Sequence, residues 1–587
     1  MIQPVAWNGC CGWLYTPPSE APRREPVVFF GPVGTDDLCA RHSLALLAHD
    51  LRQQGHTVLR FDWPGTGDSL GNLTDDGLWE QWLQAGDSAI QFLAQHTQSS
   101  SVAVLAHRLG ALVALSVLQR RSSANGSHPA AGTTQVQHLA LLAPVLQGKP
   151  YLRELKTLAD PGADHLRILG LAWGESIQSA LTQADVTTLP PPADLQTVLL
   201  ATAQSSRGLT QWESLWQPAL PVTRVPYGDL AAHIGNPLHN QHPTKLWSQM
   251  LQWGQSLPTH LAILRIEPTP PAALCGPGFT ETATLIPTSM PMAGVWCRAS
   301  ASGQPMAQRP VVLMCNTGRT PHTGWGRDWV DLARTWAQAG IDSLRFDLPG
   351  WGDSPPMPNP PRAPLYSDEL QPIYAEVVQW VASQQPVVLL GSCSSTYWAF
   401  RQARSDANVR GLVLVNIPAF DWPQGVRVEE RTQPTTRSVE GYKKLAFQAE
   451  TWKRLFSGQI NLKPIVRKFA TMAQSRLAQM GQRLQPHRSA SADPGAWPTD
   501  PVTRTQEGFR RLAAHHTPVT VIYSADDEGR DVFSVPFGAS GDGFTRLSPT
   551  HRLVVLDDAD HMLSSPSARS ALLNEVLRVA LAVQASV

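Results

Sequence analysis

Short apolar runs recur along the chain, and each is followed by glycine or small polar residues and then by a helix-forming stretch. Short apolar runs bounded by turn residues predict buried strands, and strands that alternate with helices predict a mostly parallel sheet with helices on both faces. The fold class expected is therefore α/β, doubly wound. The runs that carry this pattern are residues 26–30, 102–105, 139–143, 310–314, 387–390 and 411–415.

The pattern occurs twice. Residues 60–69, RFDWPGTGDS, return 285 residues later as residues 345–354, RFDLPGWGDS. The apolar run before each loop and the strand-turn-helix segment after it keep nearly the same spacing in both halves. Three segments in one order at nearly one spacing predict an internal duplication, and so two tandem domains of the same fold.

The length of 587 residues also exceeds what one hydrophobic core normally supports. We expect a first domain over residues 1–265, a proline-rich linker over 266–278 and a second domain over 279–587. Residues 420–500 interrupt the strand pattern and predict a helical cap on the second domain. Between residues 437 and 488 this cap carries eleven Lys or Arg against two Glu. Such a charge indicates either a solvated helical face or a docking surface for an anionic substrate or acidic carrier protein.

The segment VVLLGSCSS, residues 387–395, combines a buried strand, a tight turn and the start of a helix. It resembles the nucleophile elbow of α/β-hydrolases, which reads Gly-x-Ser-x-Gly on the same frame. Cys393 occupies the position of the serine, and Ser395 replaces the last glycine. The frame therefore predicts a cysteine nucleophile, and Ser392 and Ser394 lie off its centre. The alternative is that Cys393 is a small buried hydrophobic residue.

In this fold an acid and then a histidine follow the nucleophile along the chain. The predicted strand 519–523 is followed by Asp526 and Asp527, and the predicted strand 552–556 is followed by His561. We expect a triad of Cys393, His561 and Asp527, with Asp526 as the alternative acid. His561 would take the thiol proton, and the carboxylate would orient the imidazole.

The oxyanion needs two N–H donors, which we place at Ser394 and at Thr317, in the loop after the strand 311–314. Asn316, in the same loop, is a candidate substrate-binding residue. This chemistry requires neither a metal nor an organic cofactor. The aspartates of the repeated loops are expected to bind the glycine turns of their own loops; they are Asp62, Asp68, Asp347 and Asp353.

In the first half, Arg108 stands where the nucleophile would be, and a guanidinium cannot attack a carbonyl. His233, His239 and His242 follow without a clear strand–histidine pattern. The first domain is therefore predicted to be catalytically inactive, with a structural or binding role. Arg108 could receive a carboxylate or phosphate of a ligand, or could be satisfied by local carbonyl groups.

Two resemblances refine the function. The first half resembles α/β-hydrolases that accompany bacterial exosortase and exopolysaccharide systems, through residues 107–111, HRLGA, and 143–149, APVLQGK. The second half is similar to serine-aminopeptidase-like hydrolases with a Gly-x-Cys-Ser elbow, through residues 316–318, 345–354, 391–395 and 560–561.

These resemblances imply hydrolysis of an ester, thioester or amide in a bacterium. The acyl substrate would be a small molecule, free or presented by an acyl carrier protein or coenzyme A. The alternatives are an acyltransferase in polysaccharide or secondary-metabolite assembly, and a non-catalytic scaffold.

Bulk properties exclude several other classes. The formal net charge is zero, which does not favour nucleic-acid binding. No apolar run approaches the roughly 18 residues of a membrane span, and residues 1–15 lack the pattern of a secretion signal. The seven cysteines are scattered, without a disulfide framework or zinc spacing. We therefore expect a cytoplasmic enzyme.

Overall fold

The structure is a computed structural model that describes residues 1–125, 134–160, 165–237, 239–259, 273–300, 303–431 and 497–586. The chain divides into two compact units, Met1–Asn359 and Pro360–Val587. The first unit contains the whole first repeat and the first strands of the second repeat. The remaining strands of the second repeat belong to the second unit.

The first repeat forms an eight-stranded sheet in the order β1-β2-β4-β3-β5-β6-β9-β10. Strands β1 and β2 are antiparallel to their neighbours, and all later pairs are parallel. The strands of the sheet are β1 (Ile2–Trp7), β2 (Cys10–Tyr15), β3 (Arg24–Phe30), β4 (His56–Phe61), β5 (Ala103–His107), β6 (His138–Leu142), β9 (Thr197–Thr202) and β10 (Val222–Pro226). A separate hairpin pairs β7 (Arg167–Ile168) with β8 (Leu171–Ala172).

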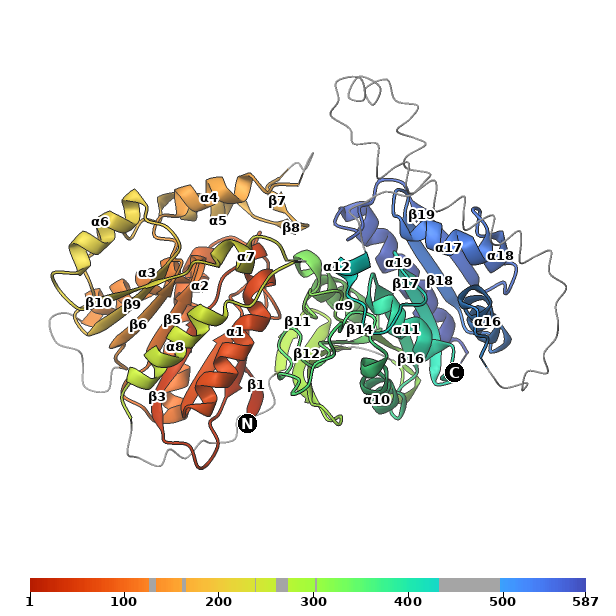
Figure 1. Ribbon diagram of the computed structural model, residues 1–587, viewed down its shortest axis with the longest axis horizontal. Helices are drawn as coiled ribbons and strands as arrows, with labels where there is room; N and C mark the ends of the chain where they lie inside the picture. The colour runs from red at the N-terminus through yellow and green to blue at the C-terminus, as the bar shows by residue number, and fades with distance from the viewer. Residues whose placement is uncertain are drawn as a thin grey trace, which may run out of the picture. The chain divides into compact units, whose positions relative to one another are not determined.

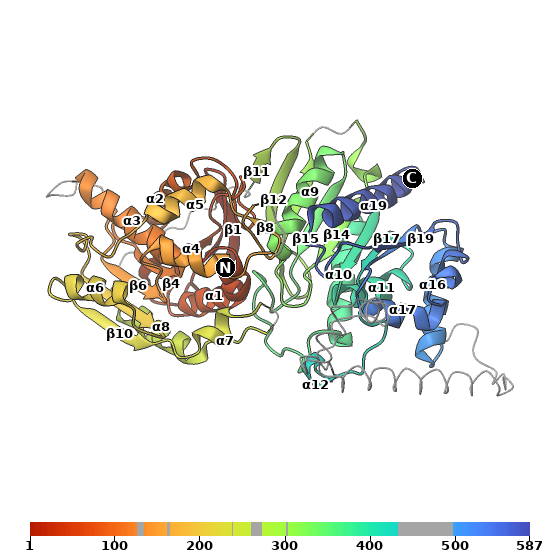
Figure 2. The same ribbon diagram turned by 90° about the horizontal axis from the view of Figure 1, so that it is seen from above.

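Helices cover both faces of this sheet. Figure 1 shows α1 and α8 in front of the strands, and Figure 2 shows α2 and α3 on the opposite side. Two separate apolar clusters lie against the two faces, because successive residues of β3 point to opposite sides. The helices are α1 (Thr35–Gln53), α2 (Leu78–Thr97), α3 (Leu109–Asn125), α4 (Gly148–Lys156), α5 (Glu175–Gln183), α6 (Arg207–Trp216), α7 (Leu230–Ile234) and α8 (Thr244–Ser256).

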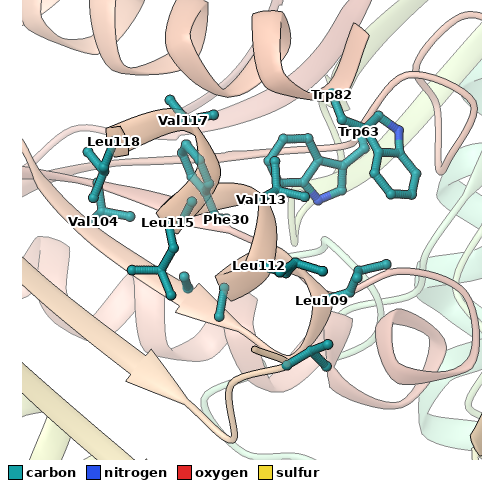
Figure 3. Packing of buried hydrophobic residues seen from close by; sticks show 14 of the residues in the cluster. Phe30, Trp63, Trp82, Val104, Leu109, Leu112, Val113, Leu115, Val117 and Leu118 are labelled. Atoms are coloured by element: carbon teal, nitrogen blue, oxygen red, sulfur yellow. The ribbon is translucent and has the colours of Figure 1, made fainter. Parts of the chain in front are cut away.

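Helix α3 starts directly after the first elbow and packs deeply into one of these clusters. Its side chains Leu109, Leu112 and Val113 lie beside Trp63 and Trp82 (Figure 3). All five side chains are fully buried. This packing fixes α3, the helix after the first elbow, against the sheet. The strand-turn-helix pattern of the sequence predicted such close packing.

In the second repeat, the strands of the first unit follow the order β11-β12-β13-β15-β14, and those of the second unit follow β16-β17-β18-β19. Strand β14 pairs with β15 in parallel, and β16 to β19 are mutually parallel. The strands are β11 (Ala273–Gly276), β12 (Phe279–Ile286), β13 (Met292–Ala299), β14 (Val311–Cys315), β15 (Asp342–Phe346), β16 (Val387–Ser392), β17 (Val409–Val415), β18 (Val519–Ser524) and β19 (His551–Leu556).

The helices of the second repeat alternate with these strands. They are α9 (Asp328–Gln338), α10 (Gln371–Ala382), α11 (Ser395–Ala403), α12 (Val428–Arg431), α16 (Pro501–Ala514), α17 (Gly529–Phe537), α18 (Asp542–Thr545) and α19 (Pro566–Gln584). Three short 3₁₀ turns accompany them, at Met306–Gln308, Trp325–Arg327 and Asp368–Leu370. The predicted tandem, mostly parallel α/β architecture is confirmed.

Two predicted segments lie partly outside the described residues. Residues 273–276, which were expected to belong to the linker, form β11, while residues 260–272 are not described. Most of the predicted cap, including its basic stretch, falls in residues 432–496, which are also outside the described parts. Of the cap, residues 420–431, which include α12, and residues 497–500 before α16 are described.

The two glycine loops share one backbone conformation. Gly65 and Gly350 both have φ of 78°, and Gly67 and Gly352 have φ of 47° and 48°. A Cβ atom on Gly352 would lie 2.0 Å from a carboxylate oxygen of Asp347, so no other residue fits at this position. Each glycine loop thus closes around the carboxylate of an aspartate, which is Asp62 in the first repeat and Asp347 in the second.

The two glycine loops exchange ion pairs between the repeats. Arg60 of the first repeat lies 3.1 Å from Asp353 of the second, and Arg345 of the second lies 3.0 Å from Asp68 of the first. Both arginines and both aspartates hold equivalent positions in the repeated motif. The expectation that all four aspartates bind their own loops is thus wrong for Asp68 and Asp353.

All seven cysteines are free thiols. Within the described ranges, none of the helices combines the length and apolarity needed to cross a bilayer.

Candidate active site

Cys393 lies between the end of β16 and the start of α11. Its φ is 49°, and its N–H donates to the carbonyl of Val415 at 3.0 Å. A positive φ is unusual for a residue with a side chain, and such strain is concentrated at functional sites. Arg108 of the first repeat has φ of 53° and donates to the carbonyl of Leu142 at 3.0 Å. Both segments therefore have the same elbow geometry.

Small residues on either side allow the elbow of Cys393 to form. A Cβ atom on Gly391 would lie 2.8 Å from the Cα of Thr396, so this glycine permits the close approach of helix and strand. Ser395 takes the place of the second glycine and closes the turn instead. Its hydroxyl donates to the carbonyl of Ser392 at 2.9 Å and accepts the N–H of the same residue at 2.9 Å.

His561 follows β19, and its Nδ1 lies 2.5 Å from Oδ2 of Asp527. The other carboxylate oxygen of Asp527 accepts the N–H of Gly529 at 2.8 Å. Asp527 is buried, whereas Asp526 is exposed. The structure thus brings Asp527, and not the alternative Asp526, to the imidazole.

His561 is also hydrogen-bonded to the Cys393 side chain. Burial by itself would lower the pKa of His561, but the charge of Cys393 and the hydrogen bonds to Asp527 and Cys393 raise it well above the usual value. The imidazolium is therefore the favoured form of His561 beside Cys393. A thiolate–imidazolium pair is the reactive form of a cysteine nucleophile.

Asn416, which the sequence argument did not single out, holds the loop that carries His561. Its Nδ2 donates to the carbonyl of His561 at 2.7 Å, and its Oδ1 accepts the N–H of Ser524 at 2.8 Å. It has φ of 48°, as Ala143 has φ of 43° after the corresponding strand of the first repeat. The sequence feature that could have indicated this role is its position directly after the predicted strand 411–415.

Tyr366 is a second residue that the sequence did not reveal. It is 5% exposed and adopts φ of 63°. Its ring stacks on Trp422 with 4.7 Å between centroids and meets Tyr397 edge-on at 5.6 Å. Tyr397 lies four residues after Cys393, so these three rings form an aromatic wall near the elbow.

The wall is fixed by hydrogen bonds to the backbone. Gln424 donates to the carbonyl of Tyr366 at 3.3 Å, and the Trp398 indole donates to the carbonyl of Ser367 at 3.0 Å. Burial, followed by the nearby charges of Cys393 and Glu528, raises the pKa of Tyr366 well above its usual value. The phenol therefore stays protonated.

Of the predicted oxyanion residues, Ser394 is buried as the N-cap of α11 and directly follows the nucleophile. Thr317 and Asn316 are buried in the loop after β14. The Asn316 Oδ1 accepts the N–H of Leu348 at 3.0 Å, so this side chain ties the loop to the neighbouring glycine loop. Its expected role in substrate binding gains no support from this contact.

Arg108 is already paired by protein carboxylates. Its guanidinium lies 2.9 Å from Asp36 and 2.5 Å from Glu154, and it covers the ring of Tyr151. Burial opposes its charge, but these neighbours raise its pKa. Of the two alternatives for Arg108, these contacts favour an arginine that is bound by the protein itself over one that receives a ligand. The groups that bind it are carboxylates, whereas local carbonyl groups were expected.

The first repeat retains a histidine after its last strand. His233 follows β10 as His561 follows β19, but it is 1% exposed. Its ring nitrogens lie 2.6 Å from the Ser43 hydroxyl and 2.5 Å from the Tyr227 hydroxyl. Burial lowers the pKa of His233 to about 3. Strand β9 of the first repeat holds the position that β18, the strand before Asp527, holds in the second. Residues 203–206, which follow β9, contain no carboxylate. The first repeat therefore has neither a nucleophile nor an acid at the equivalent positions.

One group of metal-ligand side chains occurs among the described residues. Ligand atoms of Asp68, His322 and Asp353 lie within 4.8 Å of one another. Cationic side chains already face these carboxylates, since Arg41 lies 2.7 Å from Asp353 and Arg345 lies 3.0 Å from Asp68. The charge of the cluster is thus balanced by the protein itself, which does not favour a cation there.

Comparisons with known families agree with the fold of both repeats. A family described as serine aminopeptidase, S33, matches residues 39–186, and the alpha/beta hydrolase family matches residues 312–573. Both halves of the chain therefore have the α/β-hydrolase fold. The serine aminopeptidase match falls on the first half of the chain, whereas this resemblance was expected for the second half. These matches support a hydrolytic or acyl-transfer activity in general terms.

No curated protein matches the sequence. Among solved structures, the ferulic-acid-bound Est1E of Butyrivibrio proteoclasticus is 15% identical, with a TM-score of 0.34, over 43% of this chain and 98% of its own. An α/β serine hydrolase without a lid from Xanthomonas campestris is 15% identical, with a TM-score of 0.28, over 44% and 96% of the two chains. A Pyrococcus furiosus esterase is 12% identical, with a TM-score of 0.30, over 53% and 95%.

Proposed function

We propose that the second repeat is an acyl-transfer enzyme that forms a covalent acyl-enzyme on Cys393 and hydrolyses an ester, thioester or amide. The observation that carries this proposal is His561, which hydrogen-bonds the Cys393 side chain on one side and Asp527 on the other. A nucleophile, a base and an orienting acid in contact are the requirement for covalent catalysis of this kind.

In the first half-reaction, the Cys393 thiolate attacks the carbonyl carbon of the substrate. The tetrahedral oxyanion is stabilised by backbone N–H groups, for which Ser394 and Thr317 are the proposed donors. His561 then gives its proton to the leaving alcohol, thiol or amine, and the C–S bond of the acyl-enzyme remains. Asp527 stabilises the imidazolium until that proton is given up.

In the second half-reaction, neutral His561 takes a proton from water, and the hydroxide attacks the thioester carbon. Collapse of the new tetrahedral species breaks the C–S bond, releases the carboxylic acid and restores the thiolate–imidazolium pair. The aromatic wall of Tyr366, Tyr397 and Trp422 would form one side of an acyl pocket.

The second candidate function is acyl transfer to an alcohol or amine. It is favoured by the identity of the nucleophile, because a thioester intermediate is prone to aminolysis. An acyl carrier protein or coenzyme A would deliver the acyl group, and the resemblance of the first half suggests polysaccharide or secondary-metabolite assembly. An exposed basic cap would suit such carriers, but its residues lie outside the described parts.

Intact-mass spectrometry tests the proposal. The protein is incubated with a panel of acyl thioesters and p-nitrophenyl esters, and we expect one acyl adduct that is absent from Cys393→Ala. Cys275→Ala is the matched control, since Cys275 is an exposed thiol outside the site and its variant should keep the adduct. A panel that labels the wild type and Cys393→Ala equally would leave a scaffold as the remaining function. Added alcohols and amines then separate transfer from hydrolysis.

A further inference from the structure

Tyr366 lies in the same compact unit as Cys393, Asp527 and His561. It has φ of 63° and is 5% exposed. A positive φ is a genuine outlier for a bulky residue, and it persists only where the surrounding structure determines it. Such residues are concentrated at functional sites, so the strained backbone of Tyr366 points to a role in the site beside it.

Tyr366 and Ser367 are bound to α11, the helix that starts at the elbow. The Tyr366 ring meets the Tyr397 ring edge-on with 5.6 Å between centroids, and the Trp398 indole donates to the carbonyl of Ser367 at 3.0 Å. Tyr397 and Trp398 belong to the first turn of α11. The Trp422 ring stacks on the Tyr366 ring at 4.7 Å. These contacts fix the Tyr366 ring relative to the nucleophile that precedes α11.

The hydroxyl of Tyr366 differs from that of its neighbour Tyr397 in what it binds. The Tyr397 hydroxyl donates to Asp368 at 2.8 Å and accepts from Arg401 at 2.9 Å. Among the described residues, Tyr366 has a hydrogen bond at its carbonyl and two ring contacts, and its hydroxyl has no hydrogen-bond partner. Polar groups inside a protein are normally paired, so this donor is available to a ligand.

The charge of Cys393 acts on the Tyr366 phenol, as does that of Glu528. Cys393 hydrogen-bonds His561, whereas between the described side chains of Cys393 and Tyr366 the interaction is one of charge alone. The hydroxyl therefore lies near the sulfur without being bonded to it. An oxyanion lies in the same relation to the sulfur, because it is carried by the carbon that the sulfur has attacked. Burial and the two charges raise the pKa of Tyr366 well above its usual value, so the phenol is protonated and can donate.

We infer that Tyr366 is a further catalytic residue, whose hydroxyl donates a hydrogen bond to the oxyanion that forms when Cys393 attacks its substrate. This inference rests on the proposed function, because it requires an acyl substrate. The phenol keeps its proton throughout, and no covalent bond to Tyr366 forms or breaks. The hydrogen bond strengthens as the carbonyl oxygen gains charge, so it stabilises the transition state more than the bound substrate. A donor that is fixed before the substrate binds needs no rearrangement during the reaction.

Two reactions of Cys393 separate a donor to the oxyanion from an effect on the thiol. Acylation by a p-nitrophenyl ester passes through an oxyanion, whereas alkylation by iodoacetamide displaces iodide directly and forms none. Tyr366→Phe removes the hydroxyl and keeps the ring. We expect its acylation rate to fall by about tenfold or more, since loss of one oxyanion donor typically costs ~10²–10³ in rate. Its alkylation rate should stay within about twofold of the wild type.

A thionoester of the same acyl group tests which atom receives the hydrogen bond. Sulfur replaces the carbonyl oxygen in this substrate, and sulfur is a weak acceptor. The loss of acylation rate in Tyr366→Phe should therefore be clearly smaller with the thionoester than with the oxygen ester. An equal loss with both substrates would overturn the inference, because a change in packing would affect them alike.

Tyr151→Phe is the matched control, because it makes the same change in the first repeat, where the Tyr151 hydroxyl lies 3.5 Å from Asp36. It should leave both rates unchanged. Equal acylation of the oxygen ester by the wild type and Tyr366→Phe would also overturn the inference, and so would a parallel loss of acylation and alkylation. Failure of the proposed function would look different, because adducts would then be independent of Cys393 in the wild type.

Discussion

At Cys393 and Arg108 the same backbone conformation carries different side chains. Both residues have φ near 50°, and both N–H groups bind the carbonyl that ends the next strand. Only Cys393 has a histidine with an acid behind it. The elbow geometry is thus a property of the fold, whereas reactivity depends on the side chains placed around it.

Removal of the imidazole should slow every reaction of the thiol at neutral pH. In His561→Gln we expect the rate of iodoacetamide alkylation at pH 7 to fall by about tenfold or more, because the cation that stabilises the thiolate is lost. The rate should recover at high pH, where the thiol ionises without help. Asp527→Asn should show a smaller loss, and Asp526→Asn should behave as the wild type. A pH profile that is identical in His561→Gln and the wild type would contradict the proposed pairing.

A cysteine at the first elbow should remain unreactive. In Arg108→Cys/Cys393→Ala we expect no acyl adduct, since His233 is buried and bound to Ser43 and Tyr227. Loss of the guanidinium also leaves Asp36 without its ion pair, so the melting temperature should fall. An acyl adduct on the introduced thiol would show that the first repeat had kept a usable base.

At the scale of elements, the glycine loops connect strands that are far apart in the sequence. Arg345 lies in β15 and is fully buried between Asp68 and Glu281 of β12. The conformation of β15 and of the loop of residues 316–327 thus depends on a carboxylate from the first repeat, because Asp68 contacts both Arg345 and His322. Buried ion pairs are costly to break singly, because one charge is left without its partner.

Asp68→Asn, a substitution in the first repeat, should therefore destabilise β15 and residues 316–327 of the second repeat. We expect the free energy of unfolding to drop by about 3–5 kcal/mol. Amide hydrogen exchange should accelerate in β15 and in residues 316–327, with little change in β5 and β6. Glu80→Gln, which removes an exposed ion pair with Arg120, is the control and should leave exchange unaltered. Uniform acceleration in all strands would argue against a local effect.

Short apolar runs were sufficient to predict the central strands, and the motif repeated after 285 residues predicted the duplication. The resemblance to a nucleophile elbow placed Cys393 after one strand and His561 after another, because both positions are defined by the strand that precedes them. The choice between Asp526 and Asp527 needed the structure, since both residues follow the same strand. The exchange of Asp68 and Asp353 could not be predicted, because their partners lie more than 250 residues away. Tyr366 carries no motif, and its position depends on packing against Trp422.

At the scale of the molecule, the buried side chain of His322 makes the free energy of unfolding depend on pH. Burial alone would lower the pKa of His322, but Asp68 and Asp347 raise it well above its usual value. A histidine with a raised pKa contributes stability fully below its unfolded pKa of about 6.5 and loses that contribution as the pH rises through the folded value.

The free energy of unfolding should therefore decline as the pH rises above about 6.5. The decline should be smaller in His322→Gln, and chemical denaturation at several pH values measures the difference. His561 contributes with the same sign, so the comparison is made between His322→Gln and the wild type at each pH. Equal slopes in the two proteins would assign the decline to other groups.

The reciprocal contacts of Arg60 with Asp353 and of Arg345 with Asp68 have a consequence for ancestry. In a two-fold symmetric homodimer, residue i of one copy binds residue j of the other, and residue j of the first copy binds residue i of the second. The two repeats show this pattern. A single-repeat ancestor with this loop could have paired with itself through the same four side chains. Fusion of its duplicated genes would have kept the interface while freeing one copy to lose its nucleophile. Loss of the first repeat would then leave Arg345 and Asp353 of the second repeat without these ionic partners.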